Sequence, residues 1–66
     1  MASDFEYTGV ANQQAGFREK NSGVQHWLQT GGDVDVELRD GDEVVITSGG
    51  QRNVWSIRQQ RIIGYA

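Results

Sequence analysis

The chain has 66 residues, no cysteine, one histidine and a formal net charge of −3. This length permits a single β domain at most, over residues 1–66, and the lack of cysteine excludes disulfides and thiolate metal sites. The acidic balance disfavours a general binder of nucleic acid, and no apolar run is long enough to span a membrane.

A chain this short also predicts association. A domain near this size buries only about 60% of the surface that its unfolded chain exposes, so its stability is marginal. Small domains compensate with disulfides, metals or oligomerisation. Disulfides are excluded here, and His26 does not make a zinc site on its own. We therefore expect no cofactor, and either a homo-oligomer or a protein partner in an assembly.

The predicted elements begin near the N-terminus. Residues 1–6 contain two acids and no apolar stretch, so they do not resemble a signal peptide, and we expect a cytoplasmic protein. Apolar segments then recur between glycines at a spacing of about ten residues, which is typical of consecutive short strands. They predict strands over residues 4–10, 24–29, 33–39, 43–48, 53–58 and 61–65.

The segment between the first two strands has a different character. Residues 11–23 are polar, with Phe17 as their only large apolar side chain. They predict a long polar loop or a short helical turn. The expected fold class is therefore all-β: a small antiparallel β-barrel or β-sandwich, formed by a meander of about five or six short strands.

The clearest local signal is a hairpin that begins at residue 33. Residues 33–39 alternate between polar and apolar side chains, which predicts a strand with one wet and one apolar face. A three-residue turn at 40–42 pairs Leu38 with Val44, whereas a two-residue turn moves the apolar residues of the returning strand onto the acidic face. We therefore predict the three-residue turn, which also pairs Val36 with Ile46. The predicted core comprises Val34, Val36, Leu38, Val44, Ile46, Trp55 and Ile57.

Acidic side chains gather around this hairpin. Residues 33–43 carry six acids and one arginine, hence a net charge of −5. Their spacing does not fit a calcium-binding EF-hand loop, which needs a glycine at its sixth position and a glutamate at its twelfth. We interpret them as a solvated strand face and turn, and as half of an interface. This acidic strip comprises Asp33, Asp35, Glu37 and Asp42.

The remainder of the chain has the opposite charge. Residues 44–66 contain three arginines and no acid, hence a net charge of +3. This basic strip comprises Arg52, Arg58 and Arg61. A subunit with one acidic hairpin and one basic C-terminal part is complementary to its own copies, and head-to-tail contacts close into rings or propagate as filaments.

Two other classes of binding protein remain open. The basic strip together with Trp55 as a stacking platform is typical of a single-stranded nucleic-acid binder, although three arginines supply little counterion release. Trp27, beside His26, is a candidate contact for a small ligand or a glycan. Both tryptophans are also candidates for the core.

No catalytic arrangement is recognisable in the sequence. The chain has one histidine, no cysteine, no nucleophile elbow and no phosphate loop. A domain of this size offers no pocket in which a pair of carboxylates is buried and tuned. We expect a protein that is not an enzyme.

One segment resembles a known family. Residues 41–46 (GDEVVI) followed by residues 54–57 (VWSI) are similar in outline to a hairpin in head–tail joining proteins of long-tailed phages. In that hairpin a Gly-Asp pair opens a strand, and an aromatic-x-aliphatic strand returns after a polar loop. The resemblance implies an assembly protein, with a virion as an alternative location, and no functional residue is carried over.

Overall fold

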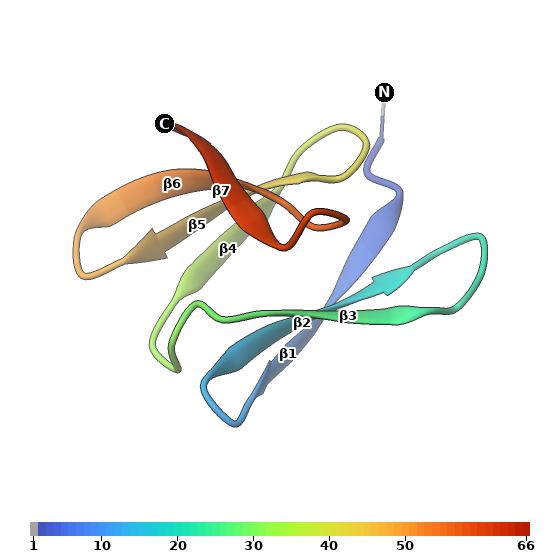
Figure 1. Ribbon diagram of the computed structural model, residues 1–66, viewed down its shortest axis with the longest axis horizontal. Helices are drawn as coiled ribbons and strands as arrows, with labels where there is room; N and C mark the ends of the chain where they lie inside the picture. Colours follow the sequence, from blue (N-terminus) through green and yellow to red (C-terminus); the bar gives the residue numbers. More distant parts are fainter. Residues whose placement is uncertain (1) are drawn as a thin grey trace.

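A computed structural model describes residues 2–66, and these residues form seven antiparallel strands in two sheets with no helix (Figure 1). No segment among them is therefore a helix long and apolar enough to cross a membrane. The predicted all-β class is confirmed. The strands are β1 (Phe5–Ala11), β2 (Gln14–Glu19), β3 (Gln25–Leu28), β4 (Asp35–Leu38), β5 (Glu43–Ser48), β6 (Gln51–Ser56) and β7 (Arg61–Tyr65).

The two sheets are meanders that pack face to face. One sheet has the order β1-β2-β3 and the other the order β4-β5-β6-β7. At one seam, a parallel bridge joins Ser3 to Gly41. At the other seam, the side-chain amide of Gln60 donates a hydrogen bond to the carbonyl oxygen of Trp27 at 3.1 Å. Because the sheets stay separate, the fold is a small sandwich and not a closed barrel.

The hairpin at β4 and β5 has the predicted register. Leu38 lies opposite Val44 and Val36 opposite Ile46, across a turn at residues 40–42. Gly41 adopts a φ of 66°, a conformation that glycine adopts without a steric penalty. The three-residue turn is therefore confirmed, and it directs these two apolar pairs toward the other sheet.

The prediction for residues 11–23 is wrong, because this segment contains strand β2. Ala15 and Phe17 of β2 are fully buried, and β2 is the central strand of its sheet. The turn from β1 to β2 uses Asn12 and Gln13, with φ angles of 53° and 66°. Two consecutive positive φ angles fit the tight turns preferred in β-hairpins, which usually contain glycine.

The other predicted strands correspond to observed ones. The segments predicted at 43–48 and 61–65 match β5 and β7, and the ends of the remaining four differ by one or two residues. The meander therefore has seven strands, one more than the upper prediction.

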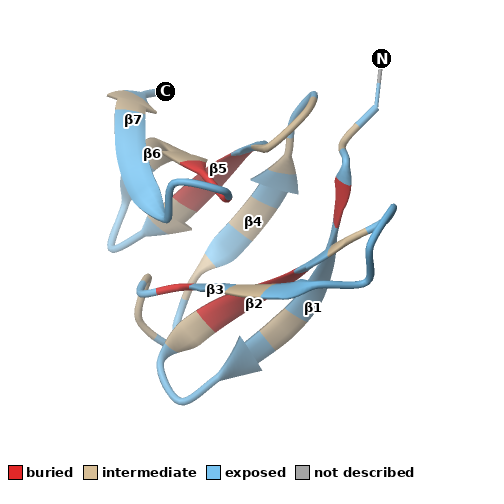
Figure 2. Ribbon diagram, turned by 45° about the vertical axis from the view of Figure 1, so that its right-hand side comes forward, coloured by how far each residue is buried: buried red, intermediate tan, exposed pale blue. Residues whose placement is uncertain are grey.

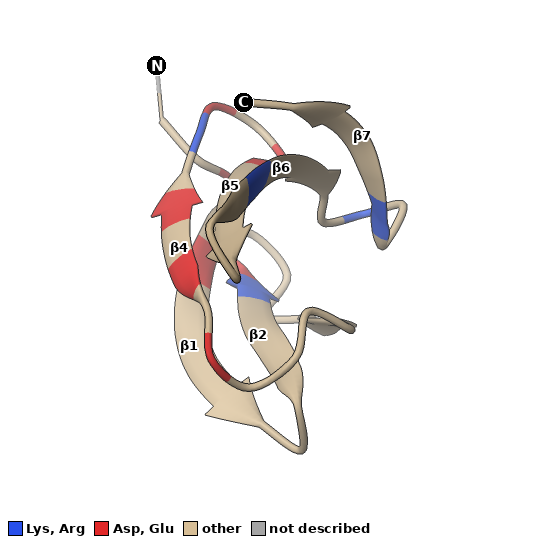
Figure 3. Cartoon of the chain, turned by 90° about the vertical axis from the view of Figure 1, so that its left-hand side faces the viewer, with Lys and Arg blue, Asp and Glu red and all other residues tan. Residues whose placement is uncertain are grey.

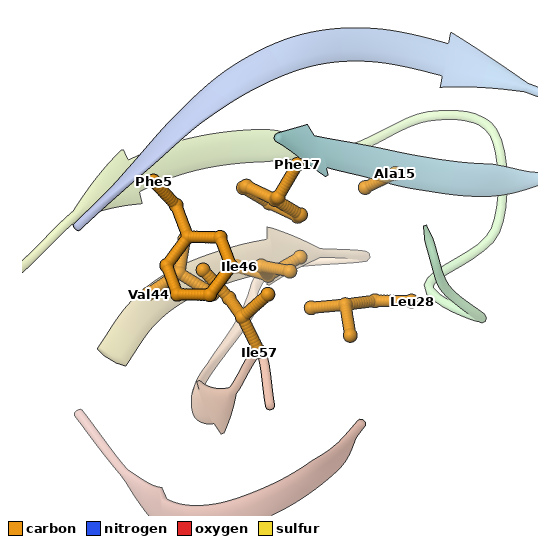
Figure 4. Packing of buried hydrophobic residues seen from close by; sticks show 7 residues of the cluster. All are labelled: Phe5, Ala15, Phe17, Leu28, Val44, Ile46 and Ile57. Carbon is orange, nitrogen blue, oxygen red and sulfur yellow. The ribbon is translucent and has the colours of Figure 1, made fainter. Parts of the chain in front are cut away.

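The core lies between the sheets (Figure 4). Phe5, Ala15, Phe17 and Leu28 from the three-stranded sheet pack against Val44 and Ile46 from the four-stranded sheet and against Ile57 in the turn after β6. The predicted core is confirmed in its centre, while Val34, Val36, Leu38 and Trp55 are partly buried around it. The predicted core does not include the four residues from the three-stranded sheet.

Candidate functional site

Three of the four residues of the acidic strip lie on or next to β4, and the fourth, Asp42, does not. Asp35 and Glu37 are exposed on the outer face of β4, and Asp33 is exposed just before it (Figure 3). Asp42 is set apart, because its carboxylate accepts a hydrogen bond from the buried hydroxyl of Ser56 at 2.6 Å. This carboxylate helps hold the turn in place and is not a free interface group.

Glu37 joins the two charged strips within one molecule. Its two carboxylate oxygens lie 3.6 Å from Arg39 and 3.6 Å from Arg52. Arg52 reaches Glu37 from β6, across the intervening strand β5. The pairs are exposed and therefore contribute little to stability. Some of the acidic and basic groups that the sequence predicts to meet between copies therefore pair with each other within one chain.

The basic strip does not form one surface. Arg52 lies beside Glu37, whereas Arg58 reaches from the turn after β6 to Glu19 of β2. The guanidinium of Arg58 also lies 5.2 Å from the ring centre of Phe5, within the range of a cation–π contact. Arg61, at the start of β7, has no acidic partner within residues 2–66; its Nε donates to Gln59 at 2.8 Å.

The contact between Glu19 and Arg58 links the two sheets and shifts the pKa of both groups. The hydroxyl of Ser22 and the guanidinium of Arg58 donate hydrogen bonds to the Glu19 carboxylate and lower its pKa. The same carboxylate raises the pKa of Arg58. Arg58 therefore has a structural role, and it is not available to a ligand without breaking this contact.

The two tryptophans occupy different environments. Trp55 is half-buried against the core, so it does not present a free stacking surface. Trp27 is 38% exposed and lies on the outer face of the three-stranded sheet, with its ring against Gly16. The arginines and Trp55 that a nucleic-acid strip requires are not brought together on one face.

His26 does not support Trp27 in a ligand site. Adjacent residues of a strand point to opposite faces, and His26 stacks edge-on against Phe5 with ring centres 5.3 Å apart. Its Nε2 atom is buried without a hydrogen-bond partner among the described residues. No pocket, and no cluster of three or more side chains able to hold a metal ion, occurs within residues 2–66.

Three exposed apolar side chains lie together on β7, where the sequence predicts only Arg61 as a site residue. Ile62 is 42% exposed, Ile63 is 44% exposed and Tyr65 is 78% exposed. β7 is the last strand of its sheet and has β6 as its only strand partner within residues 2–66 (Figure 2). A sequence signal for this surface was present, because the last strand of a meander is an edge and this one lacks polar alternation.

Comparisons of the chain with protein families, with curated proteins and with solved structures find no match.

Proposed function

We propose that this protein is a non-enzymatic assembly module that self-associates through the exposed edge of β7. The observation that carries the proposal is the row of Ile62, Ile63 and Tyr65 on an edge strand. An unpaired strand edge presents backbone donors and acceptors to another strand. Apolar side chains beside it add a hydrophobic contribution when a partner covers them.

The near absence of charged side chains on β7 supports protein association. Natural edge strands are usually protected by charged side chains or proline. β7 has one charge, Arg61 at its first position, and the chain contains no proline. This edge is therefore less protected than β4, which carries Asp35 and Glu37.

The outline shared by the β5–β6 hairpin with head–tail joining proteins supports a virion as the setting of such an assembly. The absence of pockets among residues 2–66 supports a working surface on the outside of the fold. Both observations favour a structural role over a catalytic one.

The test is the solution mass of the wild type and of Ile63→Lys, measured by sedimentation equilibrium over a wide concentration range. We expect the wild type to form multimers and Ile63→Lys to remain monomeric, because a lysine on the edge opposes strand pairing. The matched control is Val24→Lys, which replaces a residue that is 50% exposed just before β3. The control should keep the wild-type mass, and circular dichroism should show that both variants are folded. A wild type that stays monomeric at all concentrations overturns the proposal.

A further inference from the structure

The four-stranded sheet has two edges of different chemistry. Its order β4-β5-β6-β7 places β4 at one edge and β7 at the other. Figure 3 shows acidic residues along β4 and, on the opposite side, an arginine at the start of β7. Because all neighbouring strands are antiparallel and their number is even, β4 and β7 run in opposite directions. A second copy placed in the same orientation therefore presents its β4 antiparallel to the β7 of the first.

Resting on the proposed function, we infer that the partner of the β7 edge is the β4 edge of a second copy. Copies then join head to tail, and their four-stranded sheets continue as one antiparallel sheet. Such a heterologous contact leaves a free β7 and a free β4 at the two ends, so it closes into a ring or grows as a filament.

Charge favours this arrangement over the symmetric ones. A β4–β4 contact would bring Asp35 and Glu37 of one copy against the same acids of the other, and like charges across strands are destabilising. A β7–β7 contact gives Arg61 no acid to approach, since residues 44–66 contain none. Only the contact of β7 with β4 brings the free arginine to the acidic edge.

The backbone of β4 is available for such a contact. The amide of Arg39 donates to the carbonyl of Glu43 at 2.9 Å. Because hydrogen-bonded and non-hydrogen-bonded pairs alternate in an antiparallel ladder, the backbone groups of Val36 and Leu38 point away from β5. β1 contacts β4 but belongs to the other sheet, and the bridge between the sheets lies beyond β4, at Gly41.

The same alternation identifies the free backbone of β7 and a register. The amide of Ala66 donates to the carbonyl of Arg52 at 3.2 Å, so the backbone groups of Tyr65 point away from β6. Pairing Tyr65 with Val36 of the second copy aligns two residues of the inward-facing rows. Ile63 forms a bulge in β7 that takes up one residue. Arg61 therefore falls beside Arg39 of the second copy and next to Asp40, an exposed acid of the β4–β5 turn.

Gly64 fits this register as well. Counting back from Tyr65 places Gly64 opposite Glu37 of the second copy. Nothing lies within 4 Å of the position that a Cβ would occupy at Gly64. The long side chain of Glu37 therefore has room there, together with the arginines that it binds in its own chain.

A charge exchange tests the inference. Arg61→Asp places an acid close to Asp40, and Asp40→Arg places an arginine close to Arg61, so each variant alone should associate several-fold more weakly than the wild type. In a mixture of the two, every head-to-tail junction between unlike copies pairs opposite charges, and the wild-type mass should return. In a β7–β7 contact, the mixture restores nothing. A mixture as weakly associated as the single variants overturns the inference.

A disulfide trap provides the second measurement, and the natural absence of cysteine makes it unambiguous. Tyr65→Cys protein is mixed with Val36→Cys protein at equal concentration and oxidised, since opposed strand residues lie within disulfide range. We expect the mixed disulfide to exceed both homodisulfides. A dominant Tyr65→Cys homodisulfide overturns the head-to-tail contact while leaving association through β7 intact. A monomeric wild type, by contrast, overturns the proposed function itself.

Discussion

At the scale of single residues, two glycines in strands have opposite roles. A Cβ at Gly16 would lie 2.7 Å from the Trp27 ring, from the Thr8 hydroxyl and from the Gln25 side-chain amide. Thr8 and Gln25 are themselves hydrogen-bonded at 2.9 Å across the face of β2. Gly16 therefore allows the indole to lie flat on the sheet. Gly64 has no neighbour within 4 Å of the corresponding position.

Alanine at these two positions should change stability in opposite directions. Gly16→Ala should destabilise the fold by about 1–3 kcal/mol, because overpacking displaces Trp27 and the Thr8–Gln25 hydrogen bond. Gly64→Ala should stabilise it by about 0.5–1 kcal/mol, because glycine in a strand carries an entropic cost. Urea unfolding followed by tryptophan fluorescence measures both. Equal effects of the two substitutions would contradict the role assigned to Gly16.

Ser56 is a second residue whose role is local and testable. Its buried hydroxyl donates to the Asp42 carboxylate at 2.6 Å and accepts from the backbone amide of Gln59 at 3.1 Å. Ser56→Ala removes a hydrogen bond to a charged group and should lower the free energy of unfolding by about 1.5–3 kcal/mol. Ser48→Ala, at an exposed position in β5, is the matched control and should have little effect. Chemical denaturation measures the difference, and equal losses would show that Asp42 does not depend on Ser56.

At the scale of elements, the sequence predicts strands where apolar and polar residues alternate clearly. The register of β4 and β5 follows from Val36 and Leu38, because a slip of one residue would expose the whole apolar set. β2 was not predictable in the same way, since its buried face consists of the small Ala15 and the isolated Phe17. The turn before it uses Asn12 and Gln13, which lack the glycine signal of a tight hairpin.

One contact between elements should make stability depend on pH. Hydrogen bonds from Ser22 and Arg58 hold the pKa of Glu19 below its ordinary value in the folded chain. The unfolded chain therefore binds a proton at Glu19 more readily, and stability falls as the pH falls from the ordinary pKa through the folded one. In Glu19→Gln, the unfolding midpoint should vary less over this acidic range than in the wild type. Asp33→Asn removes an acid without this contact and serves as the control. A Glu19→Gln profile parallel to the wild type would show that the contact is not formed in solution.

At the scale of the whole molecule, the candidate site was predicted in part. Composition indicated association, and the charge of residues 33–43 placed acids on the strand that became the β4 edge. The prediction that the basic strip forms one surface is wrong, because Arg52 and Arg58 pair with acids that only the fold brings close to them. Sequence order alone does not show such pairs, since Arg58 and Glu19 are 39 residues apart.

Association and stability should be coupled in a domain this small. A partner that binds only the folded chain adds RT ln(1 + [L]/Kd) to the free energy of unfolding, so the wild type should unfold at a higher temperature as its concentration rises. Above the dissociation constant, each tenfold rise adds about 1.4 kcal/mol, which corresponds to several degrees for a domain of this length. Ile63→Lys removes the β7 contact and should unfold at a temperature independent of concentration. Differential scanning calorimetry over a hundredfold concentration range measures both. If the unfolding temperature of the wild type is as independent of concentration as that of Ile63→Lys, association does not contribute to the stability of the fold.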